Sequence, residues 1–247
     1  MKQNKRIPRI STRGFYDLGT GKTIKKKPYD LYPKRFFAEL GKYPEFTIMV
    51  HGLRNNKSDA IAKFRIAQNR LRQLGYRHPV IGFSYDSNTK GVQYKSGVLE
   101  ATMIGRIIAR KNGKNLAQFV QNFKKNCPHT KIRLMGHSLG TEVILYALVS
   151  LKHKKNTIES VYFFGSSITS LQMLKLGRTV KDVIAKKILN YYSLRDEVLK
   201  YAHEHQMIES PIGCLSLRET IPKYVQKQVR PRNHRFASYS STLVSFP

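Results

Sequence analysis

The sequence predicts an α/β fold with a mostly parallel central sheet, and three observations point to it. Short apolar runs typical of strands alternate along the chain with amphipathic helical stretches, as a parallel sheet requires. The stretch Lys131 to Ser150 (KIRLMGHSLGTEVILYALVS) changes from strand spacing to helical spacing at Ser138. The length of 247 residues suits a single large domain of this class. We therefore expect one such domain over residues 45–247.

Residues 1–44 are basic and rich in turn formers, and we expect a basic N-terminal segment that is a candidate source of the first strands. Within it, Gly19-Thr20-Gly21-Lys22-Thr23 resembles part of a phosphate-binding loop. That motif needs a glycine where Tyr16 stands, and it needs an apolar strand before it. A hairpin turn between FYDL and TIKKK is the preferred interpretation.

The remaining elements follow from hydrophobic spacing and from turn residues. Strands are expected at 45–50, at 79–83, from Lys131, at 160–164, at 187–192 and at 224–229. A helix with a core-facing apolar stripe is expected after Ser58 or Asp59, either of which can cap it, and it ends at Gly75. Residues 98–123 predict one or two helices, with a break near Asn112-Gly113. The mostly helical segment 166–186 is a candidate cover for the functional site.

Ser138 is the candidate nucleophile. It lies in Gly136-His137-Ser138-Leu139-Gly140, between the predicted strand and helix. At such a turn the two flanking glycines let strand and helix approach closely, and the amide of Leu139 at the helix N-terminus is free to donate to an oxyanion. Serine also caps helices after strands, but a cap does not require a glycine on both sides.

A serine hydroxyl needs a base, and the base needs a carboxylate that fixes its tautomer. Among the acids after Ser138, only Asp196 and Glu197 directly follow a strand, and Asp196 is the preferred acid with Glu197 as the alternative. An ion pair with Arg195 or the capping of the next helix would also explain Asp196. His234 is the only later histidine that follows a further strand, which makes it the candidate base.

An oxyanion site also requires a second amide, from the loop after an early strand. His51-Gly52 ends the first strong strand, and the amide of Leu53 is the candidate second donor. We expect His51 to orient this loop and His137 to pack beneath Ser138, both in structural roles. The proposed chemistry requires neither a metal ion nor a cofactor, because a serine, a histidine and an acid suffice.

The net charge of +30, from 45 Lys and Arg against 15 Asp and Glu, would attract nucleic acid, anionic membranes or acidic substrates. The basic residues recur along the whole chain, and no nucleic-acid-binding motif accompanies them. We therefore expect no specific nucleic-acid partner, but weak association with an anionic membrane or polymer. No apolar run predicts a signal peptide or a membrane span, and Cys127 and Cys214 are expected to be free thiols. We expect a cytoplasmic protein, with peripheral membrane attachment as the alternative.

With these residues in place, the chain resembles the lipase- and esterase-like α/β-hydrolases. The resemblance covers roughly residues 45–240 and rests on VHGLRNN, VIGFSYDSN, GHSLGTEV, YYSLRDEVL and NHRFASY. Tyr85 stands where that pattern usually has tryptophan. The resemblance implies an eight-stranded, mostly parallel sheet with helices on both faces, and hydrolysis of a small-molecule or lipid ester through an acyl-enzyme. Two alternatives remain open, which are acyl transfer by the same three residues and a non-catalytic protein that binds an anionic polymer or membrane.

Overall fold

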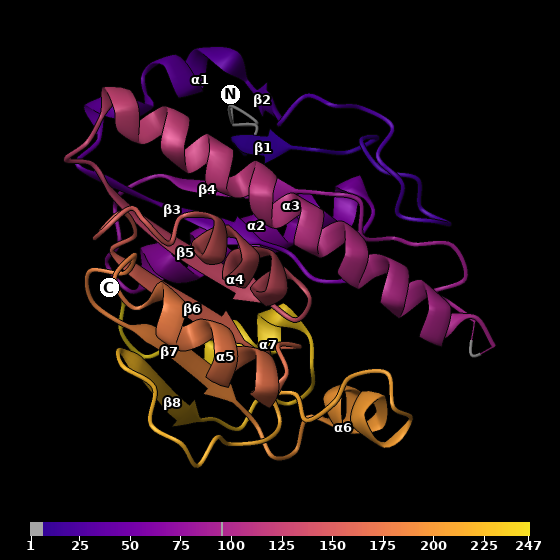
Figure 1. Ribbon diagram of the computed structural model, residues 1–247. Helices are drawn as coiled ribbons and strands as arrows, with labels where there is room; N and C mark the ends of the chain where they lie inside the picture. Colours follow the sequence, from indigo (N-terminus) through magenta and orange to yellow (C-terminus); the bar gives the residue numbers. More distant parts are fainter. Residues whose placement is uncertain (1–6, 95) are drawn as a thin grey trace.

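The computed structural model describes residues 7–94 and 96–247 and contains one eight-stranded sheet flanked by helices (Figure 1). The first six residues of the predicted N-terminal segment lie outside the described residues. The strands are β1 (Arg9–Ser11), β2 (Asp30–Tyr32), β3 (Glu45–Val50), β4 (Val80–Ser84), β5 (Lys131–His137), β6 (Ser160–Phe164), β7 (Ile188–Tyr192) and β8 (Tyr224–Gln228). The α-helices are α1 (Lys34–Ala38), α2 (Lys57–Gln73), α3 (Val98–Asn126), α4 (Gly140–Ser150), α5 (Ser170–Val180), α6 (Glu197–Glu204) and α7 (Phe236–Ser241), and a 3₁₀ turn spans Leu40–Lys42.

The strand order is β2-β1-β4-β3-β5-β6-β7-β8. Every neighbouring pair is parallel except β1 and β2, which pair antiparallel at one edge. Strand β5 lies in the interior of the sheet between β3 and β6, and all six of its residues after Lys131 are buried. The carboxyl ends of β3, β5, β7 and β8 therefore lie along one edge of the sheet, where an open α/β sheet binds its ligands.

Five of the helices named above cover the two faces of the sheet. Buried side chains of α3, α4 and α5 share one apolar core with the sheet, and those of α2 and α7 share a second one on the opposite face. Figure 1 shows α3, α4 and α5 side by side in front of the strands. A mostly parallel sheet covered by helices on both faces, with a sharp strand-to-helix turn at a serine, is the α/β-hydrolase fold.

Two local expectations differ from the structure, the cap of α2 and a break in α3. The cap of α2 is Asn56, whose side chain accepts from the amide of Asp59, while the Asp59 carboxylate closes the capping box on the Asn56 amide. The predicted cap at Ser58 or Asp59 is therefore wrong, because a capping box places its acid three residues inside the helix. The predicted hairpin turn between FYDL and TIKKK is present, because Tyr16 and Thr23 pair in an antiparallel bridge and the amide of Asp17 donates to the carbonyl of Lys22 at 2.9 Å.

Helix α3 runs unbroken through Asn112-Gly113, where a break was one of the two expectations. A side chain at Gly113 would meet Cβ of Tyr146 at 2.5 Å and the amide nitrogen of Ala147 at 2.9 Å. This glycine lets α3 and α4 pack closely and does not interrupt the helix. The segment 166–186 contains α5, which is the crossover between β6 and β7 and buries Met173 and Val180 in the core.

Candidate active site

Ser138 lies at a strained turn between the buried strand β5 and helix α4. Its φ is 52°, in the left-handed region that non-glycine residues seldom adopt. Its amide donates to the carbonyl of Phe164 on the neighbouring strand at 3.0 Å, which holds the turn against the sheet. A side chain at Gly140 would collide with the carbonyl oxygens of Val50 and His51, the second at 2.5 Å. A glycine is therefore required at position 140, where the start of α4 contacts the end of β3.

The loop after β3 packs directly against this turn. A side chain at Gly52 would lie 2.9 Å from Cβ of Ser138 and 3.0 Å from the carbonyl oxygen of His137. The side chains of Leu53 and Leu139 both pack over Gly105 on α3, so the two leucines lie close together. Within residues 7–94 and 96–247, the amides of Leu53 and Leu139 donate to no acceptor. Two free N–H groups thus come from segments that both pack around Ser138.

His51 holds the loop after β3 in place from inside the protein. Its side chain is buried, and its ring stacks on Tyr85 with centroids 4.6 Å apart. Because Nε2 accepts from the amide of Tyr85 at 3.2 Å, Nδ1 carries the proton and donates to the carbonyl of Gly52 at 3.0 Å. Burial, and then the positive charge of Arg13, keep the pKa of His51 well below its ordinary value. A neutral, fixed imidazole therefore orients Gly52, and Tyr85 supplies the aromatic surface on which it rests.

Asp196 and His234 come together from the ends of β7 and β8. His234 Nδ1 donates to Asp196 Oδ2 at 2.7 Å, and the Tyr239 hydroxyl donates to the same oxygen at 2.6 Å. The other oxygen, Oδ1, accepts from the amide of Leu199 at 3.1 Å and so caps α6. The cap and the contact with histidine, which the sequence presents as alternatives, are both present on one carboxylate.

The Asp196 carboxylate is held ionised although its side chain is fully buried. Burial alone raises its pKa, but the hydrogen bonds from His234, Tyr239 and Leu199, with the charge of His234, lower the pKa below its ordinary value overall. Glu197, the alternative acid, is exposed on the first turn of α6. Tyr239 was not singled out from the sequence, and its only signal there is its nearness to His234 in NHRFASY.

His137 connects the turn at Ser138 to the loop that carries His234. Its Nε2–H donates to the carbonyl oxygen of His234 at 2.7 Å, and the two rings are 4.9 Å apart. The side chain is buried, and burial together with the charge of His234 keeps the pKa of His137 well below its ordinary value. The residue before the serine therefore fixes the backbone position of the histidine.

The hydroxyl of Ser138 and the imidazole of His234 do not share a hydrogen bond in the described part of the chain. Ser138 is partly exposed, and the His234 side chain is 14% exposed at the same edge of the sheet. Catalytic hydrogen bonds are often long in an enzyme without substrate and become shorter in its complex. Asp196 and His234 thus share a direct hydrogen bond, whereas Ser138 is linked to His234 only through its neighbour His137, which donates to the His234 carbonyl.

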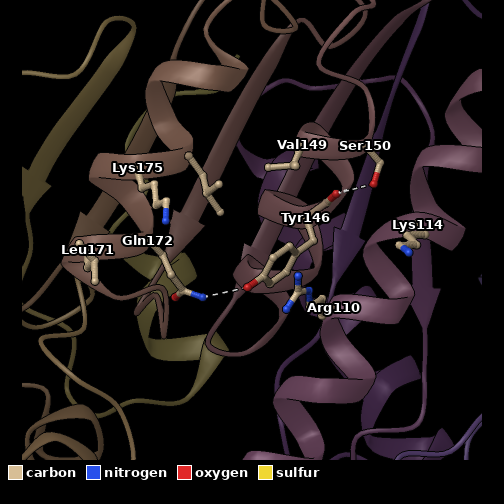
Figure 2. A pocket seen from close by; sticks show the side chains of 9 residues that line it. Arg110, Lys114, Tyr146, Val149, Ser150, Leu171, Gln172 and Lys175 are labelled. Carbon is tan, nitrogen blue, oxygen red and sulfur yellow. Dashed lines mark hydrogen bonds between the residues drawn. The ribbon is translucent and has the colours of Figure 1, made fainter.

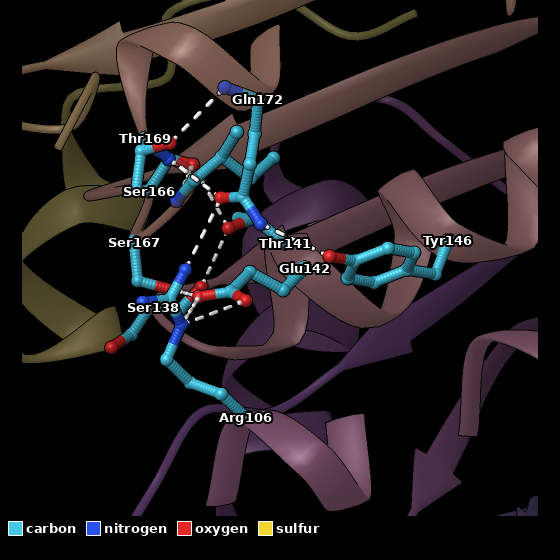
Figure 3. A network of polar contacts seen from close by, with 10 residues as sticks. Arg106, Ser138, Thr141, Glu142, Tyr146, Ser166, Ser167, Thr169 and Gln172 are labelled. Carbon is cyan, nitrogen blue, oxygen red and sulfur yellow. Dashed lines mark hydrogen bonds and ion pairs between the residues drawn. The ribbon is translucent and has the colours of Figure 1, made fainter. Parts of the chain in front are cut away.

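A buried polar network lies on the other side of Ser138, in the first turn of α4 (Figure 3). Glu142 is 1% exposed and accepts from Arg106 at 3.1 Å and from the Ser167 hydroxyl at 2.9 Å. Arg106 also donates to Gln172, which in turn donates to the Tyr146 hydroxyl at 3.1 Å. Burial raises the pKa of Glu142, and the charge of Arg106 opposes that rise. This network joins α3, α4 and α5 beside the turn that holds Ser138.

Within the described residues, no group of three His, Cys, Asp or Glu side chains is arranged to hold a metal ion. None of the helices in the same residues has a stretch long and apolar enough to cross a bilayer.

Comparisons with solved structures give matches at low identity. A cutinase from Trichoderma reesei, in complex with a phosphonate inhibitor, is 20% identical with a TM-score of 0.32, and the match covers 56% of this chain and 62% of that one. A lipase-esterase related protein from Clostridium acetobutylicum is 12% identical with a TM-score of 0.41, over 82% of this chain and 91% of that one. The catalytic core domain of an acetyl xylan esterase from Trichoderma reesei is 8% identical with a TM-score of 0.38, over 75% and 82%. Because these scores are low, the fold assignment depends on the strand order and the helix layers described above.

Comparison with curated protein sequences gives no match. Residues 98–225, from the start of α3 to the second residue of β8, match a family described as "Protein of unknown function (DUF726)". These residues contain Ser138 and Asp196 but end before His234. The match covers more than half of the chain, and the protein therefore belongs to this family.

Proposed function

We propose that the protein is a serine hydrolase that cleaves ester bonds, with Ser138 as the nucleophile, His234 as the base and Asp196 as the acid. The observation that carries the proposal is the 2.7 Å hydrogen bond between His234 Nδ1 and the buried Asp196 carboxylate. A helix cap through Oδ1 explains a buried aspartate, but it gives no reason for a partly exposed histidine on Oδ2 of the same carboxylate. This pair also lies at the edge of the sheet that carries the strained serine.

The proposed chemistry uses each group in one step. His234 Nε2 takes the proton of Ser138 as Oγ attacks the ester carbonyl, and Asp196 keeps the proton on Nδ1 and stabilises the imidazolium. The amides of Leu53 and Leu139 donate to the negative oxygen of the tetrahedral intermediate. His234 then returns the proton to the leaving alcohol, and the acyl-enzyme remains. A water molecule activated by the same imidazole then attacks the acyl-enzyme, which releases the carboxylic acid product and restores Ser138.

The substrate we propose is a small-molecule or lipid ester. The protein supplies nucleophile, base, acid and oxyanion donors from its own chain, so the proposed reaction requires no cofactor. Acyl transfer uses the same acyl-enzyme and differs only in the second step, where an alcohol takes the place of water.

The test of the proposal is Ser138→Ala with p-nitrophenyl esters. We expect turnover to fall on the order of 10⁴-fold or more, because the covalent intermediate cannot form. Ser58→Ala is the matched control, since Ser58 is an exposed serine at the start of α2 and should leave turnover unchanged.

A fluorophosphonate probe provides an independent measurement. It should label the wild-type protein on the peptide that contains Ser138, and neither Ser138→Ala nor His234→Ala should be labelled at a comparable rate. Labelling of another serine, or full turnover in Ser138→Ala, contradicts the proposal. If most of the acyl group is transferred to an added alcohol and little is released by hydrolysis, the protein is an acyltransferase instead.

A further inference from the structure

A groove that the proposed reaction does not use runs between α3, α4 and α5. Its outer part has a volume of about 380 Å³, and its inner part of about 280 Å³ begins at the Arg106–Glu142 pair. Arg110, Tyr146 and Gln172 line both parts, so the two form one continuous depression. Figure 2 shows Arg110 and Lys114 on one side of Tyr146 and residues of α5 on the other.

Three cationic side chains surround the outer part of this groove. Arg110, Lys114 and Lys175 are all exposed, and none forms an ion pair within the part of the chain that the structure describes. The guanidinium of Arg110 lies 5.3 Å from the centre of the Tyr146 ring. Among the described residues that line the groove, Glu142 is the one acid, and it already accepts from Arg106 and Ser167. The groove therefore presents a positive charge that an anion can neutralise.

The surface between and beside these cations is apolar. Val149 and Leu176 contribute to the wall, and Leu171 at the rim is 63% exposed. On α3, Met103 is 58% exposed and Ile107 is 46% exposed, and both line the inner part. A face with several large exposed apolar side chains is costly in water unless a partner covers it. Cations and apolar side chains in one groove match a ligand with an anionic end and a hydrocarbon end.

We propose that this groove binds an anionic phospholipid of a membrane surface. The lipid phosphate would lie against Arg110, Lys114 and Lys175, and the glycerol and upper acyl chains would contact Leu171, Met103 and Ile107. A polyanion such as nucleic acid would use the cations but would leave the apolar side chains uncovered. The proposal concerns binding alone and does not depend on the catalytic role of Ser138.

The experiment measures binding of the full chain to vesicles of phosphatidylcholine with and without phosphatidylglycerol, by flotation. The test variant is the triple Arg110→Gln, Lys114→Gln, Lys175→Gln. The matched control is the triple Arg65→Gln, Arg72→Gln, Arg77→Gln, which removes the same charge from a cavity of about 760 Å³ on the α2 side of the sheet. We expect the first triple to weaken binding to the anionic vesicles on the order of 100-fold, roughly fivefold for each charge near the surface. The control triple should weaken it less than about threefold, because its charges lie on the other face.

A second pair of variants tests the apolar contact. Met103→Ser with Leu171→Ser should weaken binding to the anionic vesicles at least about fivefold, since two exposed apolar side chains leave the interface. Inorganic phosphate should compete only weakly with the anionic vesicles, for the wild type and for every variant.

Three results would overturn the proposal. An equal loss of vesicle binding in both triple variants would show that the positive charge acts diffusely. Unchanged vesicle binding in the Met103→Ser, Leu171→Ser variant would show an anion site that does not contact the lipid chains. Equally strong binding to phosphatidylcholine alone would exclude an anionic headgroup. Turnover of a short neutral ester is measured alongside, and we expect it to be unchanged in the first triple. Failure of vesicle binding and failure of the proposed hydrolase activity are thereby distinguished.

Discussion

The Asp196 carboxylate stabilises three groups at once. One oxygen accepts from the first turn of α6, and the other accepts from His234 and from Tyr239. Because three donors surround it and water does not reach it, neither oxygen can turn away from His234 without losing hydrogen bonds. The neighbouring Glu197 is exposed and has no such contacts among the described residues.

This difference predicts the outcome of two conservative substitutions. Asp196→Asn should lower turnover by about 10³- to 10⁴-fold at neutral pH, because an amide favours the wrong imidazole tautomer of His234. Glu197→Gln should cost less than about tenfold. Steady-state kinetics on one ester decide between them, and a large loss in Glu197→Gln alone would transfer the acid role to that residue.

The depressed pKa of Asp196 also predicts how stability depends on pH. A carboxyl whose pKa is lower in the folded state stabilises the protein above its unfolded pKa of about 4, and this contribution disappears as the pH falls through the folded pKa. The free energy of unfolding of the wild type should therefore exceed that of Asp196→Asn by a constant amount above about pH 5, and the difference should shrink below about pH 4. Urea unfolding at a series of pH values measures it. A difference that grows towards acid pH would contradict the assignment.

Among the elements, the start of α4 and the end of β3 determine each other's position. The two segments touch at Gly140, whose missing side chain leaves room for the carbonyls of Val50 and His51. The same contact places Gly52 against Ser138 and His137. The proposed oxyanion donors on these two segments are therefore positioned by the packing of a strand end on a helix start.

Gly140→Ala should consequently reduce both stability and activity. The added methyl group meets backbone oxygens that cannot rotate away, and we expect a loss of about 2 to 3 kcal/mol in the free energy of unfolding. Turnover should fall as well, because the loop after β3 must shift. Gly19→Ala is the control, since its added methyl meets only the side chains of Lys90 and Asp17, the nearest atom at 3.2 Å. Thermal unfolding and ester turnover are measured on both, and equal effects would argue against a special role for Gly140.

At the scale of the whole molecule, the chain carries a net charge of +30, and exposed cations line cavities on both faces of the sheet. Exposed charges attract anions over distances of about a Debye length, which is near 10 Å at 0.1 M salt. Such a field accelerates the encounter with an anionic substrate and leaves the bond-breaking steps unchanged.

Raising salt from roughly 0.05 to 0.5 M should therefore lower kcat/KM for an anionic ester severalfold and leave kcat/KM for a neutral ester nearly unchanged. Parallel assays with two esters that differ only in charge measure this. If salt lowers both equally, the cause is a change in the protein's own stability.

The sequence by itself determined the alternation of strands and helices, because hydrophobic spacing depends only on near neighbours along the chain. It also identified Ser138 as the candidate nucleophile, because the glycines that such a turn requires lie within five consecutive residues, 136–140. The sequence also limited the candidate acid to Asp196 or Glu197, because these two directly follow a predicted strand after Ser138.

Only the tertiary structure decided contacts between distant segments. Whether Asp196 is buried depends on Tyr239 and His234, which lie 43 and 38 residues further along the chain. The unbroken α3 is explained by the packing of α4 on Gly113, and the groove is formed by three helices that are separate in sequence. Spacing along a chain reports which face of an element is apolar, but it does not report which other element packs there, because that choice depends on the shapes of both surfaces.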